Sequence, residues 1–170
     1  MAKLDIITLP DPLLRELSAP IESVDDDVNR LFDDMLETMY AAPGVGLAAV
    51  QVSVPKRMLV VDTSDDPEAR NPLCMVNPKI VSHSDTLRLY EEGCLSLPEV
   101  LVEIERPDKI TVEYIDREGK QRSLEADGLQ AIAIQHEVDH LEGKLIIDFL
   151  SRLKRDIIVR KFKKLSRQTS

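Results

Sequence analysis

The chain has 170 residues, of which 43% are hydrophobic, and its formal net charge is −9. That length and apolar content suit a single domain, so we expect residues 1–170 to share one core that needs no disulfide or metal to fold. Two cysteines exclude a disulfide framework and favour a reducing cytoplasm. No apolar run approaches the roughly 20 residues that cross a membrane, and the first five residues do not form a secretory signal.

Two helices are predicted near the N-terminus. Asp11 followed by Pro12 is typical of a helix cap with proline in the first turn. Between residues 25 and 41, apolar side chains recur in alternating steps of three and one, which predicts an amphipathic helix. Pro43-Gly44 is expected to end this helix, and its apolar stripe is interpreted as core packing.

The middle of the chain is predicted to form short strands joined without helices. Their expected ranges are 47–52, 57–63, 73–81, 86–90, 100–105, 109–115 and 120–125. Ile110, Val112 and Tyr114 alternate along one strand, and the sequence Arg-Glu-Gly-Lys at 117–120 then indicates a hairpin turn. Strands that follow one another without intervening helices predict mainly antiparallel sheets.

Two further helices are predicted towards the C-terminus. Asp127 could cap a helix that runs to Leu141, with Gly143 as its stop, and a last helix is expected over 148–165. The order of elements predicts an α+β fold. We expect its antiparallel sheets to pack around the helix that ends at Leu141, with one helix before them and one after them.

The helix before Leu141 carries the sequence Gln-His-Glu-Val-Asp-His at 135–140, which contains His-Glu-x-x-His. Residues four apart on a helix share a face, so His136 and His140 can reach one ion. Glu137 leaves the helix about 100° from His136, which suits a base acting on water beside a metal. The apolar stripe that continues onto both histidines consists of Leu129, Ile132 and Ala133. Because unpaired buried imidazoles are costly, this pattern favours a metal over two hydrogen-bonded core histidines.

A metal site of this kind needs a third protein ligand and an open position. No histidine follows His140, and His83 lies in a polar stretch that predicts a surface position. Cys94, preceded by a glycine and followed by a proline at 98, is the favoured candidate. Cys74 lies among apolar neighbours and is interpreted as a small buried hydrophobe. From the residues alone, the same interpretation stays open for Cys94.

Three segments together resemble the signature motifs of the peptide deformylase family. They are Gly-Val-Gly-Leu-Ala-Ala-Val-Gln at 44–51, Glu-Gly-Cys-Leu-Ser at 92–96 and Gln-His-Glu-Val-Asp-His at 135–140. The order and separations of the motifs are suitable, and the resemblance extends over nearly the whole chain from residue 11 onward. The helical C-terminal extension resembles the bacterial type with a long terminal helix.

The resemblance implies a metal-dependent hydrolase that removes the formyl group from N-formylmethionyl ends of newly synthesised polypeptides and releases formate. It implies one divalent ion per chain, Fe(II) in the cell and Zn(II) or Ni(II) in some preparations. The implied roles are metal ligand for Cys94, His136 and His140, acid/base for Glu137, and oxyanion donor for the Gln51 side chain and the Leu95 backbone N–H. From the residues alone, Gln51 is interpreted as a strand residue bonded to backbone groups.

The substrate is expected to bind along the first two motifs and the helix. The Gly-x-Gly at 44–46 lacks the third glycine and following helix of a phosphate loop, and instead favours an extended edge to which a peptide adds as a strand. The expected substrate-binding residues are Gly44, Val45, Gly46, Tyr90, Glu92, Gly93, Leu129, Ile132 and Ala133. Some relatives carry an arginine seven residues after the ligand cysteine, where this chain has Leu101, so its polar grip on the distal peptide is expected to be weaker.

Three other interpretations compete with this one. A metallopeptidase would share the metal and the acid/base. Only a comparison of activity on formylated and unblocked peptides distinguishes it from a deformylase. A closed structural zinc would need a fourth protein ligand, and no second cysteine or histidine lies near Cys94. An inactive relative is disfavoured because the motif positions are intact.

The C-terminal segment 148–170 differs in charge from the rest of the chain. It holds eight basic residues against Asp148 and Asp156. This asymmetry suggests a polyanionic partner. The deformylase resemblance implies that this partner is the ribosome. An ordinary solvated helix face is an equally good interpretation. We expect a cytoplasmic monomer that binds neither DNA nor a membrane.

Overall fold

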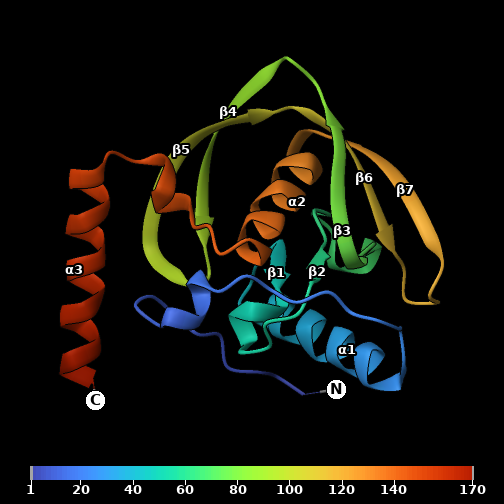
Figure 1. The fold of residues 1–170 in the computed structure, drawn as a ribbon, viewed down its shortest axis with the longest axis horizontal. Coiled ribbons are helices and arrows are strands. Elements are labelled where there is room, and N and C mark those ends of the chain that lie inside the picture. Colours follow the sequence, from blue (N-terminus) through green and yellow to red (C-terminus); the bar gives the residue numbers. More distant parts are fainter. Residues whose placement is uncertain (1, 170) are drawn as a thin grey trace.

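The computed structural model describes residues 2–169, which form two antiparallel sheets and three α-helices (Figure 1). The helices are α1 (Asp26–Ala41), α2 (Gly128–Leu141) and α3 (Arg152–Thr169). The strands are β1 (Gly46–Ala48), β2 (Met58–Val61), β3 (Leu73–His83), β4 (Leu87–Cys94), β5 (Leu97–Pro107), β6 (Lys109–Ile115) and β7 (Gln121–Asp127). One sheet has the order β1-β2-β3-β6-β7, and β4 and β5 form the other. The predicted combination of helices with antiparallel sheets is confirmed.

Strand β2 lies between two hydrophobic clusters because successive side chains point to opposite faces of a sheet. Leu59 and Val61 belong to the cluster that includes α2, whereas Met58 and Val60 belong to the cluster that includes α1. All four side chains are buried, which explains why this strand is a continuous apolar run without alternation.

Helix α2 occupies the interior of the molecule. It contacts β1, β2, β6 and β7 of the larger sheet and β5 of the hairpin, and Figure 1 shows it in orange between the two sheets. Every residue from Ala131 to Glu137 is buried, as expected for a helix that is covered on all sides. Gly143 follows it with a φ of 74°, and a Cβ there would meet the Arg15 carbonyl oxygen at 2.5 Å. The predicted helix stop is therefore confirmed and has a steric reason.

The hairpin β4–β5 and the C-terminal region share a third cluster. Leu97, Val102 and Ile104 of β5 pack there with Leu9, Leu14 and the short helix Ile146–Phe149. Helix α3 joins this cluster through buried Phe162, supported by partly buried Ile158 and Val159. The remaining apolar side chains of α3, Leu153, Ile157 and Leu165, are exposed.

The prediction of a strand over 47–52 is wrong beyond Ala48. Residues Ala49–Val52 form a 3-10 helix instead, and Ser53 closes it with a φ of 69°. The cause is local, because the Gln51 side-chain oxygen accepts a hydrogen bond from the Ala48 N–H at 2.9 Å. Such a side-chain bond within one short segment stabilises a turn of helix as an alternative to the extended backbone of a strand.

The predicted start of the last helix at residue 148 is also wrong. Asp148 belongs to the separate 3-10 helix, where its carboxylate accepts from the Leu145 N–H and from Arg15. Leu150 is extended, and α3 starts after Ser151, whose carbonyl and hydroxyl accept from the first turn of the helix. Asp127 precedes α2 as predicted, but its side chain forms no capping hydrogen bond. Strands β3, β4 and β5 are longer than predicted.

Candidate metal centre and active site

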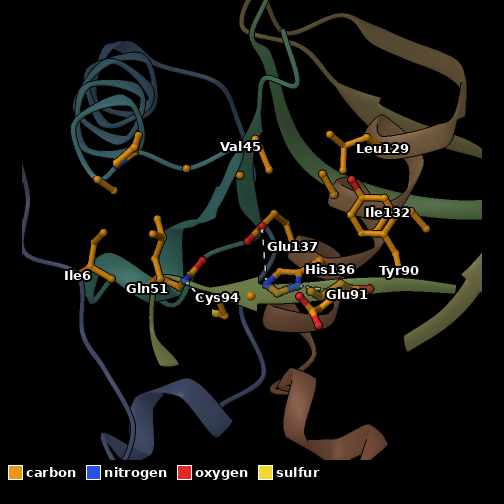
Figure 2. Close-up of a pocket in the computed structure, with 18 of the residues that line it drawn as sticks. Ile6, Val45, Gln51, Tyr90, Glu91, Cys94, Leu129, Ile132, His136 and Glu137 are labelled. Carbon is orange, nitrogen blue, oxygen red and sulfur yellow. Dashed lines mark hydrogen bonds and ion pairs between the residues drawn. The ribbon is translucent and has the colours of Figure 1, made fainter. Parts of the chain in front are cut away.

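A cavity of about 760 Å³ lies between β1, the β4–β5 hairpin and α2 (Figure 2). Its walls bring together side chains from all three predicted motifs, which are far apart in the sequence. They include every residue expected to bind substrate, which are Gly44, Val45, Gly46, Tyr90, Glu92, Gly93, Leu129, Ile132 and Ala133. The walls also include Gln51, Cys94, Leu95, His136 and Glu137. His140 lies behind this lining and is fully buried.

Three candidate ligand atoms converge at the inner end of the cavity. The ligand atoms of Cys94, His136 and His140 all lie within 4.8 Å of one another. His140 Nε2 is 3.3 Å from Cys94 Sγ and 3.2 Å from His136 Nε2. A tetrahedral ion with nitrogen ligands at about 2.0–2.1 Å and sulfur at about 2.3 Å holds these atoms roughly 3.3–3.6 Å apart. The two separations at His140 are close to these values, and one cysteine with two histidines is a donor set that suits a transition metal ion.

The orientation of His136 is set by a buried ion-pair network. His136 Nδ1 donates to Glu92 Oε1 at 3.0 Å, which leaves Nε2 directed at the other two ligand atoms. Arg106 donates to both oxygens of Glu92 at 2.7 and 3.0 Å, and to Asp139 at 2.9 Å. Burial disfavours the charged carboxylate, but the hydrogen bonds from His136 and Arg106 outweigh it and lower the pKa of Glu92.

The pKa values of the two imidazoles are shifted in opposite directions. Burial, together with the nearby His136 and Arg106, holds the pKa of His140 well below its usual value. A neutral imidazole is the form that binds a metal. Burial also opposes charge on His136, but Glu137 and the hydrogen bonds to Cys94 and Glu92 outweigh it and raise its pKa. His140 Nδ1 has no hydrogen-bond partner among the described residues.

Glu137 places its carboxylate beside the three ligand atoms without joining them. Its Oε2 is 4.0 Å from His136 Nε2, and its Oε1 has no hydrogen-bond partner within the described part of the chain. Burial raises the pKa of Glu137 to about 7. Gly46 makes room for this carboxylate, because a Cβ at that position would lie 2.5 Å from Oε2.

Gln51 is held with its amide nitrogen facing the cavity. Its oxygen accepts from Ala48 N–H at 2.9 Å, so the nitrogen must be on the other side of the amide, where it donates to Ser96 Oγ at 3.0 Å. The same nitrogen is 3.7 Å from Cys94 Sγ. Leu95 lies between Cys94 and Ser96 in the turn that joins β4 to β5.

Two kinds of residue at the site are not predicted from the sequence. Glu92 is expected there as a substrate contact, without its partners Arg106 and Asp139, although Asp139 lies within the third motif. Ile6, which lines the cavity from the N-terminal segment, has no sequence signal of its own. His83 is exposed and Cys74 is buried, both as expected, and burial raises the pKa of the Cys74 thiol to about 11.

Comparisons with known proteins identify a family. A model of the polypeptide deformylase family matches residues 3–156. A peptide deformylase of Rhizobium meliloti (strain 1021) is 56% identical over 162 residues, covering 95% of this chain and 93% of the relative. A crystal structure of the Ehrlichia chaffeensis enzyme in complex with actinonin has a TM-score of 0.92 and 43% identity, covering 98% of this chain and 99% of that one. A plant peptide deformylase structure has a TM-score of 0.89 and 34% identity, covering 98% of this chain and 90% of that one.

A Cys-His-His group that could hold a metal ion, beside a buried carboxylate at the end of a cavity, is consistent with the hydrolase class that the family model and the relatives show. The chain belongs to the peptide deformylase family. It therefore removes the formyl group from the N-formylmethionyl ends of new polypeptides, a step of N-terminal processing in protein biosynthesis. No helix within residues 2–169 has the length and apolar content needed to cross a membrane.

Proposed function

We propose that Cys94, His136 and His140 hold the catalytic metal and that Glu137 is the acid/base of the reaction. The observation that carries this assignment is the convergence of three ligand atoms within 4.8 Å, next to one carboxylate that is not among them. The cavity reaches Cys94, His136 and Glu137, so a substrate that enters it meets these groups directly. A closed structural site is disfavoured because no fourth cysteine or histidine ligand joins the three atoms among the described residues.

The proposed cofactor is one divalent ion per chain, Fe(II) in the cell, with Zn(II) or Ni(II) as replacements. Cysteine is a soft ligand and imidazole suits all three metals, so the donor set accepts each of them. The partly buried Cys94 sulfur is also open to oxidation next to a redox-active ion. Elemental analysis after anaerobic and aerobic purification measures this, and zinc as the metal in both preparations, with equal activity, would contradict the assignment of iron.

The reaction needs activated water, a site for the oxyanion and a proton for the leaving amine. When bound, the ion polarises the formyl group and makes water more acidic. We propose that Glu137 takes the proton of the attacking water and returns it to the leaving nitrogen. Gln51 Nε2 and the Leu95 N–H donate to the oxygen on which negative charge develops, and one such donor is typically worth about 3–4 kcal/mol.

The substrate backbone is proposed to add to the free edge of β1. The Asp62 N–H donates to the Val45 carbonyl, so these two residues form a hydrogen-bonded pair of the ladder. Hydrogen-bonded and non-hydrogen-bonded pairs alternate in an antiparallel ladder, and Gly46 lies opposite Val61 in the next pair. The N–H and C=O of Gly46 therefore face away from β2, on the open edge of the sheet, where an extended peptide can pair with them.

The methionine side chain is proposed to enter the apolar part of the cavity. Figure 2 shows Val45, Leu129, Ile132 and Tyr90 grouped on one side of His136 and Glu137. Ala133 lies in the same wall and is 5% exposed. Methionine is unbranched and flexible, so a pocket of this kind accepts it with little strain.

Substituting Ala133→Phe is expected to fill this pocket. We expect KM for formyl-Met-Ala-Ser to rise about ten-fold or more, because filling an apolar pocket removes a side-chain contact worth on the order of 1–3 kcal/mol. Formate release gives the kinetics, and metal content is measured on the same preparation. Ala69→Phe, at the exposed end of the short 3-10 helix Pro67–Ala69 and outside the cavity, is the control. Unchanged kinetics for Ala133→Phe would exclude this wall as the methionine site.

We further propose that residues 1–170 act as one catalytic domain, a cytoplasmic monomer that binds neither DNA nor a membrane. All three hydrophobic clusters contain segments distant in the sequence, which supports a single folding unit. The basic helix α3, which extends four residues beyond the predicted end at 165, is proposed to contact ribosomal RNA where nascent chains emerge.

The ribosome contact predicts a charge effect on sedimentation. Reversing Lys154, Lys163 and Lys164, all exposed on α3, to glutamate should weaken co-sedimentation with ribosomes, most clearly at low salt. The control reverses Lys79 and Lys109, which are exposed on the larger sheet, and Lys120 in its β6–β7 turn, and so makes the same change in net charge. Equal pelleting of the two variants would show that α3 has no special role.

A further inference from the structure

A second groove lies beside α3, next to the site described above. Its volume is about 710 Å³. One wall is the N-terminal segment 6–12, the opposite wall is the last half of α3, and the start of β5 forms the floor. Figure 1 shows α3 at the edge of the molecule, outside the hairpin. The groove arises because α3 is attached by a few apolar side chains around Phe162, while Leu165 stays 46% exposed.

The groove adjoins the active-site cavity. Ile6, Pro98 and Glu99 line both. Glu99 has a φ of 68°, in the left-handed region that non-glycine residues rarely adopt, so the backbone turns sharply where the two meet. In Figure 2, Ile6 lies on the far side of Gln51 from Leu129 and Ile132, so the boundary with the groove is opposite the proposed methionine pocket.

The wall of the groove is fixed relative to the catalytic residues. The Ile7 N–H donates to the Gln51 carbonyl at 2.8 Å, and the Leu9 N–H donates to the Ser96 carbonyl at 3.0 Å. Gln51 and Ser96 are the two residues whose side chains bond to each other beside Cys94. The N-terminal segment is therefore anchored by hydrogen bonds to residues of the active site. These bonds fix the position of the groove wall relative to the catalytic residues.

We infer that this groove binds downstream residues of the formylated polypeptide, beyond those that pair with β1. The inference rests on the deformylase activity, and cleavage of a short peptide that does not reach the groove measures that activity by itself. The occupant is an extended polypeptide with apolar side chains, because the proposed methionine pocket lies on one side of the cavity and the groove adjoins the opposite side. Its walls offer partly buried Ile7, Pro10 and Val100, with exposed Thr8 and Lys161 at the rim.

The test compares a tripeptide with a long peptide in the absence of ribosomes. The substrates are formyl-Met-Ala-Ser and a twelve-residue peptide with the same start and apolar residues further along. The unmodified protein should process the long peptide with a kcat/KM about five-fold higher or more, the gain expected from burying one additional apolar side chain. Leu165→Trp should reduce that gain to less than two-fold and leave the tripeptide value unchanged.

Two further variants make the outcome decisive. Leu153→Trp is the same substitution on the same helix, at a residue 68% exposed and outside the groove, and it should keep the full gain. Thr8→Trp blocks the groove from the opposite wall and should lose the gain as Leu165→Trp does. An equal kcat/KM for the two substrates in the unmodified protein would overturn the inference. An equal loss of the long-peptide gain in Leu165→Trp and Leu153→Trp would also overturn it. If the unmodified protein did not cleave the tripeptide at all, the deformylase activity itself would be contradicted instead.

Discussion

Replacing Glu137 by glutamine is expected to leave close to one metal ion per chain while lowering kcat by roughly 10²- to 10⁴-fold. The carboxylate lies next to the three ligand atoms, with Oε2 at 4.0 Å from His136 Nε2, and is not one of them. Removing it therefore takes away a proton carrier and leaves the ligand set intact. Glutamine has nearly the same shape, so it also keeps the contact with Gly46.

The matched comparison is His136→Ala, which removes a ligand atom from the same helix. This variant should lose most of its metal, and Cys94→Ala should do the same, because two remaining ligands bind an ion far more weakly. Metal content and kcat are measured on the same preparations of all three variants. If Glu137→Gln lost metal as severely as His136→Ala, or kept near-normal turnover, the assignment of roles on α2 would be wrong.

Local patterns were sufficient to predict α1, α2 and the spacing of the two candidate ligands on α2. The apolar periodicity of residues 26–41 and the four-residue separation of His136 and His140 depend on neighbours along the chain, and helix geometry is the same in every fold. The strand β6, with its strict alternation, has the predicted bounds of 109–115. The proposed role of Cys94 depends on the family motif, because its neighbours in the sequence favour a ligand without excluding a small buried hydrophobe.

Features that depend on contacts between distant segments could not be predicted. Arg106 is separated from Glu92 by 14 residues and from Asp139 by 33, and it becomes a partner of both only when α2 packs against the hairpin. The 3-10 helix at 49–52 was missed for a different reason. One side-chain hydrogen bond from Ala48 N–H to Gln51 overrides an apolar run that otherwise favours a strand.

Replacing Glu92 by alanine is the second substitution expected to have a large effect. The side chains of Glu92 and Arg106 are 5% and 6% exposed, and their paired hydrogen bonds keep both charges satisfied. Removing the carboxylate leaves the guanidinium buried with Asp139 as its remaining acidic partner, which typically costs about 3–5 kcal/mol of unfolding free energy. Glu103→Ala, at an exposed position on β5, is the control and should change stability little.

If Glu92 had a purely structural role, its loss would lower stability alone. The geometry predicts that its loss also weakens metal binding. His136 Nδ1 donates to Glu92 Oε1, so losing the acceptor frees the imidazole to rotate and to change tautomer. Loss of such a partner typically lowers metal affinity about 10- to 100-fold. Competition with a chelator, at a temperature where Glu92→Ala and Glu103→Ala are both folded, measures this directly. Glu92→Gln keeps one oxygen acceptor but turns an amide N–H₂ towards a donor, so its metal affinity should fall between alanine and glutamate. Equal metal affinity in all these variants would mean that the network holds the fold and has no influence on the metal centre.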